Sequence, residues 1–316
     1  MQGQSVTLTR NDDYWGTPGQ ATGVSYVYRE EPSVRAGMAR TGEASIAVPV
    51  SVQDATDDDR TRSYSDNRVF FLRTSTEKAP FTDVRVRRAA QLAIDKQTIV
   101  STLMERTGEP TDQIVAATVN GYVDGYTGAG HDPDEARRLL AEAAADGVDV
   151  QAPFDLVTRP DLFPGSDEVM QYIHQNLQAV GFTVDMLSLD TDAWLQLLRS
   201  PFPPDQKANI IAISHDNISG DASFSFPKYM ASDGSNSTIR NTEIDTLLAE
   251  AEQAVGDDRA ARYQQAAQLE YEQVNAFLPI ALQSKMLMLG PGIEYTPNSL
   301  TGVELTVADI TFPTGD

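Results

Sequence analysis

Apolar side chains recur at helical spacing from Val84 to Ala93, after a residue that can cap a helix, Thr82 or Asp83. Asp95 can cap a second helix, which follows a corner and ends at Gly108. No other part of the sequence combines so many local signals. We therefore expect a helix, a corner and a second helix around which the rest of the chain is organised.

The residues before this helix pair predict a small unit of mixed structure. Strand-like alternation at 6–10, 24–28 and 44–50, with a short helix at 33–40, is typical of a βαβ-like unit. The following segment, Asp54–Asp66, is polar and acidic and has few apolar anchors. We predict that it forms a mobile loop.

Strands and helices alternate regularly in the middle of the chain. Strands are predicted at 154–158, 182–189 and 209–213, and helices at 166–180 and 192–199. This alternation is typical of an α/β lobe whose sheet is at least partly parallel.

Further elements flank this region. Asp132 and Glu135 have the spacing of a capping box, with Pro133 at the first helical position. The segments after the alternating region are predicted as two acidic helices, a strand and a final extended piece: 243–255, 258–277, 279–289 and 303–312.

Composition narrows the class of protein. A chain of 316 residues has room for two lobes, since single cores stop growing near about 250 to 300 residues. Acidic residues outnumber basic ones 46 to 24, which gives a net charge of -22. This charge disfavours a nucleic-acid partner, because phosphate backbones bind where Lys and Arg cluster. The absence of cysteine excludes disulfides and thiolate metal sites.

The sequence also bears on targeting. No apolar run reaches the roughly 18 residues of a membrane span. The first residues have neither the basic start nor the apolar core of a signal peptide. If the natural protein is exported, we expect its leader and any lipid anchor to be missing from this chain.

Charged residues follow two of the predicted strands. Arg159 comes directly after the strand at 154–158, and His215 and Asp216 follow the strand at 209–213. Ligands of open α/β sheets bind outside the carboxyl ends of the strands. Arg159 could receive a carboxylate and Asp216 an ammonium, so that the two would clamp a zwitterion from one face of the lobe. The alternative is a structural ion pair, or two separately solvated charges.

Signals for metal binding and catalysis are weak. The three histidines, His131, His174 and His215, are far apart in the sequence, so no metal site is predicted. Ser225 and Lys228 match an S-x-x-K pattern, but Pro227 disfavours the helix that this motif needs. We interpret the match as chance and predict neither an enzyme nor a cofactor.

Several stretches, in this order along the chain, resemble the extracellular solute-binding proteins of family 5, the peptide and nickel receptors of ABC transporters. The matching runs cover nearly the whole chain: LTRNDDYWG, GEASIA, PFTDVRVRRAAQLAIDKQTIV, GEPTDQIVAATVNGY, DPDEARRLLAEA, NLQAVGFTVD, NTEIDTLLAEA and DDRAARYQQAAQLEYEQVNAFLPIAL. The combination of the Pro-Phe-x-Asp-x-x-Val-Arg run with the Tyr-Trp-Gly turn is more specific than any single run.

The resemblance implies roles for the residues at the two strand ends. Arg159 looks like the arginine that receives a peptide carboxylate in dipeptide-type receptors, and Asp216-Asn217 looks like the aspartate that anchors the free amine. His215 departs from the residue type usual before that aspartate. Residues 218–219 look like an insertion, which makes Asp221 a rival anchor.

The same resemblance implies a two-lobed α/β fold of the periplasmic-binding-protein type (type II), with one lobe incomplete because the chain starts just before the Tyr-Trp-Gly turn. The lobes are expected at 1–76 with 279–316, and at 77–278. The lobe at 77–278 can close its own core, whereas a cleft with one incomplete wall would bind solute weakly or not at all.

The function that follows is the substrate-binding component of an ABC importer. It would bind a short peptide or similar small solute between two lobes by hinge closure and deliver it to a permease in the membrane. We expect a monomer, located in the periplasm or at the extracellular membrane surface. A nickel or metal-chelate receptor of the same fold is the first alternative. A hydrolase is the second, disfavoured because no nucleophile motif is present.

Overall fold

The computed structural model describes residues 5–56, 58–104, 107–298 and 305–313. These residues belong to two compact units. Unit 1 contains residues 1–66 and 284–316, and unit 2 contains residues 67–283. Whether the two units correspond to the lobes expected at 1–76 with 279–316 and at 77–278 stays a prediction.

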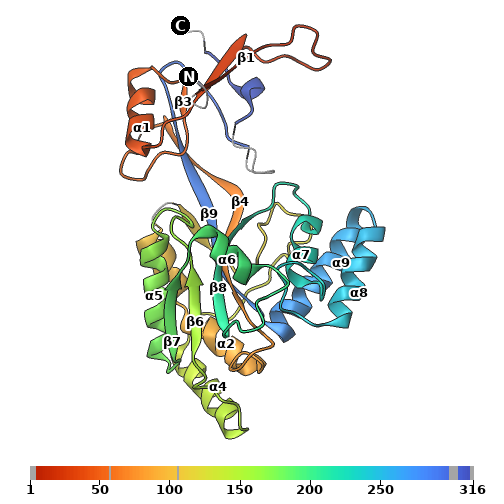
Figure 1. Cartoon of the computed structure of the whole chain (residues 1–316). Helices are drawn as coiled ribbons and strands as arrows, with labels where there is room; N and C mark the ends of the chain where they lie inside the picture. The colour runs from red at the N-terminus through yellow and green to blue at the C-terminus, as the bar shows by residue number, and fades with distance from the viewer. Residues whose placement is uncertain (1–4, 57, 105–106, 299–304, 314–316) are drawn as a thin grey trace. The chain divides into compact units, whose positions relative to one another are not determined.

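The helices and strands follow one another in a mixed α/β order (Figure 1). The strands are β1 (Ser5–Thr9), β2 (Gly23–Val27), β3 (Ile46–Ala47), β4 (Thr61–Thr74), β5 (Gly108–Pro110), β6 (Phe154–Thr158), β7 (Val184–Ser188), β8 (Asn209–Asp216) and β9 (Phe277–Leu289). The helices are α1 (Pro32–Thr41), α2 (Val84–Ala93), α3 (Lys96–Thr98), α4 (Pro133–Ala145), α5 (Ser166–Ala179), α6 (Thr191–Leu198), α7 (Phe226–Met230), α8 (Thr242–Gln253) and α9 (Gly256–Leu269). Short 3₁₀ or π-helical turns lie at Ile99–Leu103, Ala222–Phe224, Glu270–Val274 and Val307–Asp309.

The main sheet has the strand order β3-β9-β4-β8-β6-β7, and β5 pairs with β9. Strand β6 is parallel to both β7 and β8, whereas β8 runs antiparallel to β4. The sheet is therefore mixed, which confirms the predicted partly parallel α/β lobe.

Helices cover both faces of the unit 2 part of this sheet, because apolar side chains alternate along its strands (Figure 1). Leu156 and Ile210 pack in a cluster with α2, α4 and α5. Val157 and Ile211 face the other way and pack with α6, α7, α8 and α9. A strand buried on both faces is expected to read as a continuous apolar run, and β8 does so from Ile210 to Ile213.

The central helix pair forms as predicted, with a difference at its end. The Asp83 carboxylate accepts a hydrogen bond from the Arg85 backbone amide at 2.7 Å, and Asp95 accepts one from Thr98 at 3.0 Å. These are N-caps, which satisfy amides that the helix leaves without partners. Gly108 does not end the second helix, because it begins β5.

Three predictions for unit 1 and its neighbours are wrong. Strand β1 pairs antiparallel with β2 in a separate sheet, and β3 joins β9, so no βαβ unit exists there. The Asp54–Asp66 segment is not a loop throughout, since β4 begins at Thr61, whereas its mobility stays a prediction. Residue 57 lies outside the described residues. The predicted extended piece at 303–312 contains a 3₁₀ turn at Val307–Asp309, and its first two residues, 303–304, are not described.

The capping box at α4 is half formed. The Asp132 carboxylate accepts a hydrogen bond from the Glu135 amide at 3.0 Å, as predicted. The Asp132 amide donates instead to the Leu92 carbonyl at 2.9 Å, and the Glu135 carboxylate binds the Arg138 guanidinium. Tertiary contact with α2 therefore replaces the second half of the box.

Candidate functional site

Strands β6 and β8 end at the same edge of the sheet, because they are adjacent and parallel. The sequence predicted that β8 ends at Ile213, but it continues to Asp216, where Arg68 of β4 is its antiparallel partner. His215 and Asp216 therefore lie within the strand, and Arg159 lies directly after β6. The extension was missed because polar residues that continue an apolar strand look like the start of a loop.

Arg159 is held in place, but its guanidinium makes few hydrogen bonds. Its guanidinium carbon lies 5.4 Å from the centre of a Trp194 ring, and the indole nitrogen of Trp194 donates to the Ala212 carbonyl at 3.2 Å. The guanidinium Nη1 reaches only the Pro160 carbonyl, at 3.4 Å, and the buried Nε has no partner among the described residues. A guanidinium fixed on an aromatic ring with free donors is suited to binding a carboxylate.

Asp216 is paired already. Its carboxylate lies 3.1 Å from the Arg68 guanidinium, and the two side chains are 39% and 32% exposed. This is the structural ion pair that the sequence left open as the alternative, although its partner is Arg68.

The expectation that Arg159 and Asp216 share one face of the sheet is wrong. Arg159 lies on the same face as Val157, against Trp194. His215 also faces this side, where its ring lies 4.9 Å from that of Tyr229. Asp216 is the next residue of β8, so strand alternation directs it to the opposite face. Whether either residue binds a solute stays a prediction.

His215 and Asn217 hold the loop after β8. Asn217 donates from its side-chain amide to the Ser225 hydroxyl at 3.0 Å and to the Asp221 carbonyl at 2.9 Å. The His215 Nε2 lies 2.9 Å from the Ser225 hydroxyl. Burial, followed by the charge of Lys228, lowers the pKa of His215 to about 4, so the ring is neutral near pH 7.

A serine and a histidine within hydrogen-bonding distance are also the beginning of a hydrolase site. Ser225, however, is fully buried, and its hydroxyl also accepts the Asn217 amide. The described residues supply no carboxylate hydrogen-bonded to the His215 ring. A substrate could not reach this hydroxyl, so the pair is a packing contact.

Asp221, the rival anchor, is bound within the fold. Arg259 donates to its two carboxylate oxygens at 2.8 and 3.0 Å, and the Asn120 amide donates to one of them at 2.9 Å. Burial opposes ionisation, but the hydrogen bonds from Arg259, Ser223 and Asn120 outweigh it and hold the pKa of Asp221 well below its ordinary value. These contacts leave the carboxylate little capacity for a solute amine.

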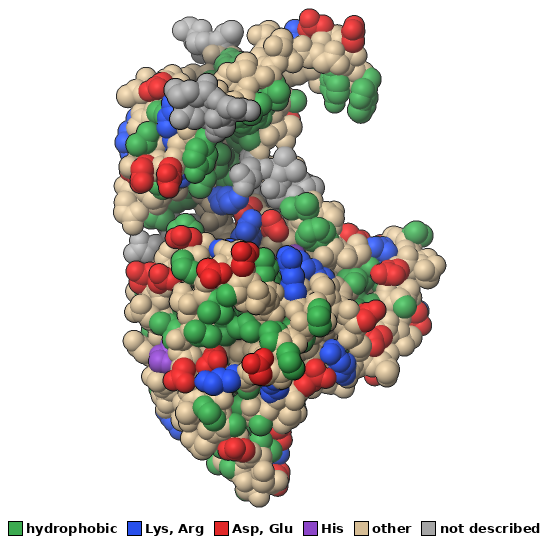
Figure 2. Space-filling view, in the orientation of Figure 1, with side chains coloured by type: hydrophobic (Ala, Val, Ile, Leu, Met, Phe, Trp, Pro, Cys, Tyr) green, Lys and Arg blue, Asp and Glu red, His purple; other side chains and the backbone are tan. Residues whose placement is uncertain are grey.

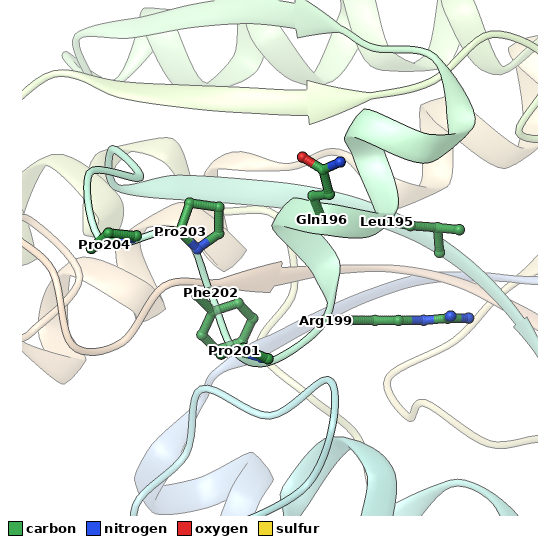
Figure 3. Close-up of a pocket in the computed structure, with 7 residues that line it drawn as sticks. All are labelled: Leu195, Gln196, Arg199, Pro201, Phe202, Pro203 and Pro204. Atoms are coloured by element: carbon green, nitrogen blue, oxygen red, sulfur yellow. The ribbon is translucent and has the colours of Figure 1, made fainter.

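Two cations that sequence reasoning missed lie on the same side of the sheet as Trp194. Arg199 follows the last residue of α6, and Lys228 lies in α7. Arg199 borders an open surface pocket of about 520 Å³, where it is the charged member among Leu195, Gln196 and the Pro201–Pro204 segment. Leu195 and Arg199 extend to the same side of the chain, and Phe202 and the prolines line the rest (Figure 3). No motif marks these residues, since they meet only in the fold.

The described parts of the chain contain neither a metal-binding cluster nor a membrane-spanning helix. There, the structure places no three His, Asp or Glu side chains where they could hold a metal ion. No helix in those parts is both long and apolar enough to cross a membrane.

Comparison with known proteins identifies relatives that are similar to this chain in sequence. Heme-binding protein A of Haemophilus influenzae is 27% identical over 231 residues, which cover 72% of this chain and 41% of that protein. The dipeptide-binding protein of Escherichia coli is 24% identical over 194 residues, or 58% of this chain and 36% of that protein. The chain thus spans about half the length, or less, of these curated relatives.

Solved structures show the same fold at lower identity. HbpA2 from Haemophilus parasuis matches with a TM-score of 0.82 at 19% identity, over 99% of this chain and 62% of that one. The dipeptide binding protein from Pseudoalteromonas sp. SM9913, in complex with Met-Leu, matches with a TM-score of 0.73 at 18% identity, over 98% and 62%. The family-5-type α/β fold predicted from the sequence is confirmed.

One family model matches three quarters of the chain. It is the model of the bacterial extracellular solute-binding proteins, family 5 Middle, and the match covers residues 1–237. This span includes Arg159, directly after β6, together with Trp194 in α6 and Asp216 in β8. The chain belongs to the bacterial extracellular solute-binding proteins of family 5.

Proposed function

We propose that this chain is part of the solute-binding component of an ABC importer, which binds a short peptide or a similarly small solute and delivers it to a membrane permease. Its family and its relatives, named for dipeptides and for heme, support this role. The protein would act as a monomeric receptor outside the cytoplasmic membrane and would release its solute chemically unchanged. It would not be an enzyme.

The observation that carries the proposal is the state of Arg159. Most arginines in the described ranges donate to carboxylates or backbone carbonyls at hydrogen-bonding distance, whereas Arg159 has one contact at 3.4 Å and a buried Nε for which those ranges supply no partner. A buried donor without a partner destabilises the fold by about 1 to 3 kcal/mol. A solute carboxylate would give this guanidinium a charged partner at its other donors, since a guanidinium can donate to both oxygens at once.

Solute capture would proceed by closure of two lobes on a hinge. Closure would exclude water from the solute and strengthen each polar contact. Asp216 lies on the opposite face of the sheet and its carboxylate is bound to Arg68, so we propose that Arg159 acts on the solute without it.

Calorimetry with dipeptides and with the matching C-terminal amides tests this proposal. Arg159→Gln should weaken dipeptide binding roughly 10- to 100-fold, the equivalent of one charge-assisted bidentate contact. The C-terminal amides should bind weakly to the wild type, and their affinity should be the same for Arg159→Gln. Arg262→Gln is the control, since its cation is paired with Glu250 at 3.2 Å on the surface. Equal dipeptide affinities for all three proteins would contradict the role of Arg159.

A further inference from the structure

Arg199 and Lys228 differ from the other cations of the chain. Every other lysine or arginine in the described ranges has a carboxylate within ion-pair distance or a hydrogen-bond acceptor. Arg199 and Lys228 have neither within those ranges. In a protein with 46 acidic and 24 basic residues, unpaired cations are unexpected. Acidic side chains are indeed spread over the visible face of unit 2 (Figure 2).

The backbone brings these two cations together. After α6, the Ser200 amide donates to the Ser235 carbonyl at 2.7 Å, and the next residue, Asn236, donates to the Lys228 carbonyl at 2.9 Å. Gly234 allows the two backbone segments to approach this closely, because a Cβ atom there would lie 2.4 Å from the Pro227 carbonyl oxygen. The end of α6 and the helix α7 are thus joined by a fixed turn.

The two like charges act on each other in this arrangement. The Lys228 ammonium is half-buried and lies 5.4 Å from the centre of the Tyr229 ring. Burial and then the charge of Arg199 lower the pKa of Lys228, while Asp216 acts in the opposite direction. Asp216 neutralises little of this charge, since its carboxylate is bound to Arg68. His215 and Tyr229 are the other titratable groups that face the ammonium, and both are neutral near pH 7.

We propose that Arg199 and Lys228 form an anion-binding subsite for a carboxylate or phosphate group of the solute. This inference rests on the proposed function and specifies its substrate class as acidic solutes. The guanidinium of Arg199 suits a planar or tetrahedral anion, and Lys228 adds a point charge. The apolar pocket beside Arg199 would take a non-polar part of the same solute (Figure 3).

Titration of the whole chain with inorganic phosphate and with citrate, at constant ionic strength, tests the subsite. Arg199→Gln and Lys228→Gln should each weaken binding of the tighter anion by roughly tenfold, the effect expected for one charge-assisted contact. Arg262→Gln, which removes a paired surface cation, should leave the affinity unchanged. Tighter phosphate binding would indicate a phosphorylated solute, and tighter citrate binding a carboxylate. Equal anion affinity in all four proteins would overturn the subsite.

A spectroscopic readout separates direct binding from general screening. In the dimethylated protein, the NMR signal of Lys228 can be assigned by its loss in Lys228→Arg. Without anion, this signal should titrate below the ordinary pKa of a lysine. Saturating phosphate or citrate should raise its pKa, whereas sodium chloride at the same ionic strength should change it little. No shift with either anion would overturn the proposal.

The outcomes also separate this inference from the proposed function. If Lys228→Gln weakens anion binding but no peptide binds, the subsite holds and the peptide-receptor role fails. If Arg159→Gln weakens dipeptide binding while the anion affinities of all variants are equal, the receptor role holds and the subsite fails.

Discussion

Replacement of Glu270 by Gln should abolish part of the pH dependence of folding. Glu270 lies in the π-helical turn after α9 and is fully buried. Its Oε1 accepts hydrogen bonds from the amides of Ala276 and Phe277, at 2.7 and 3.1 Å, whereas Oε2 has no partner among the described residues. Burial raises the pKa of Glu270 to about 8, against the opposing effects of these amides and of Arg87.

The direction of the effect follows from proton counting. Between the ordinary pKa of 4.5 and the folded value of about 8, the native state binds more protons at Glu270 than the unfolded state does. Stability from this group is therefore complete below pH 4.5 and is lost as the pH rises toward 8. The loss is at most about 1.4 kcal/mol per pH unit, or about 3 kcal/mol between pH 5 and pH 7.

Urea unfolding followed by circular dichroism, at half-unit steps from pH 5 to pH 8, measures this slope. The free energy of unfolding should fall more steeply with pH for the wild type than for Glu270→Gln. Glu272→Gln serves as the control, because Glu272 is exposed in the same turn and the substitution removes the same charge. Parallel curves for the wild type and Glu270→Gln would refute the assignment of a raised pKa.

Two further predictions concern charged groups bound within the fold, and one concerns a surface strand. Arg73→Met should lower the free energy of unfolding by about 2 to 5 kcal/mol in urea, because it deprives the Leu197, Leu198 and Asn236 carbonyls of their donor; an unchanged midpoint would contradict this. Asp221→Asn should lower the free energy of unfolding by about 1 to 2 kcal/mol at pH 7. The loss should become smaller as the pH falls below 4, because the lowered pKa of Asp221 means that only its ionised carboxylate stabilises the fold. A loss that does not change with pH would exclude stabilisation by the ionised carboxylate. Thr7→Ala should change stability by less than about 0.5 kcal/mol, because its hydroxyl contact with Ser25 is exposed; a larger change would show that the β1–β2 pair matters more than its exposure indicates.

The elements of unit 2 could be predicted because local signals and tertiary packing agree there. Asp95 and Asp132 were recognised as caps from sequence and cap their helices in the structure. For α2 the sequence offered Thr82 or Asp83, and Asp83 is the cap. The pairing of β1 with β2 could not be predicted in the same way. Alternating residues define a strand but not its partner, and the turn between these strands has no hairpin signature.

The candidate site was predicted only in outline. Arg159 was placed correctly at the end of β6, because the apolar run stops there. The end of β8 was misplaced, and a side-chain period of two then sends Asp216 to the opposite face from Arg159. The Arg199 and Lys228 pair could not be seen in the sequence, since a turn at Gly234 and Ser235 brings α6 and α7 together.

The most direct test of the receptor role is thermal unfolding of the whole chain with defined di- and tripeptides at 10 mM, followed by mass analysis of the recovered solute. Even a dissociation constant of 1 mM would stabilise the native state by about 1.4 kcal/mol, which is readily measured. A solute-binding protein should be stabilised by some of these peptides, less so after Arg159→Gln, and should return them intact. Stabilisation that Arg159→Gln leaves unchanged, or recovery of hydrolysed peptides, would contradict the account.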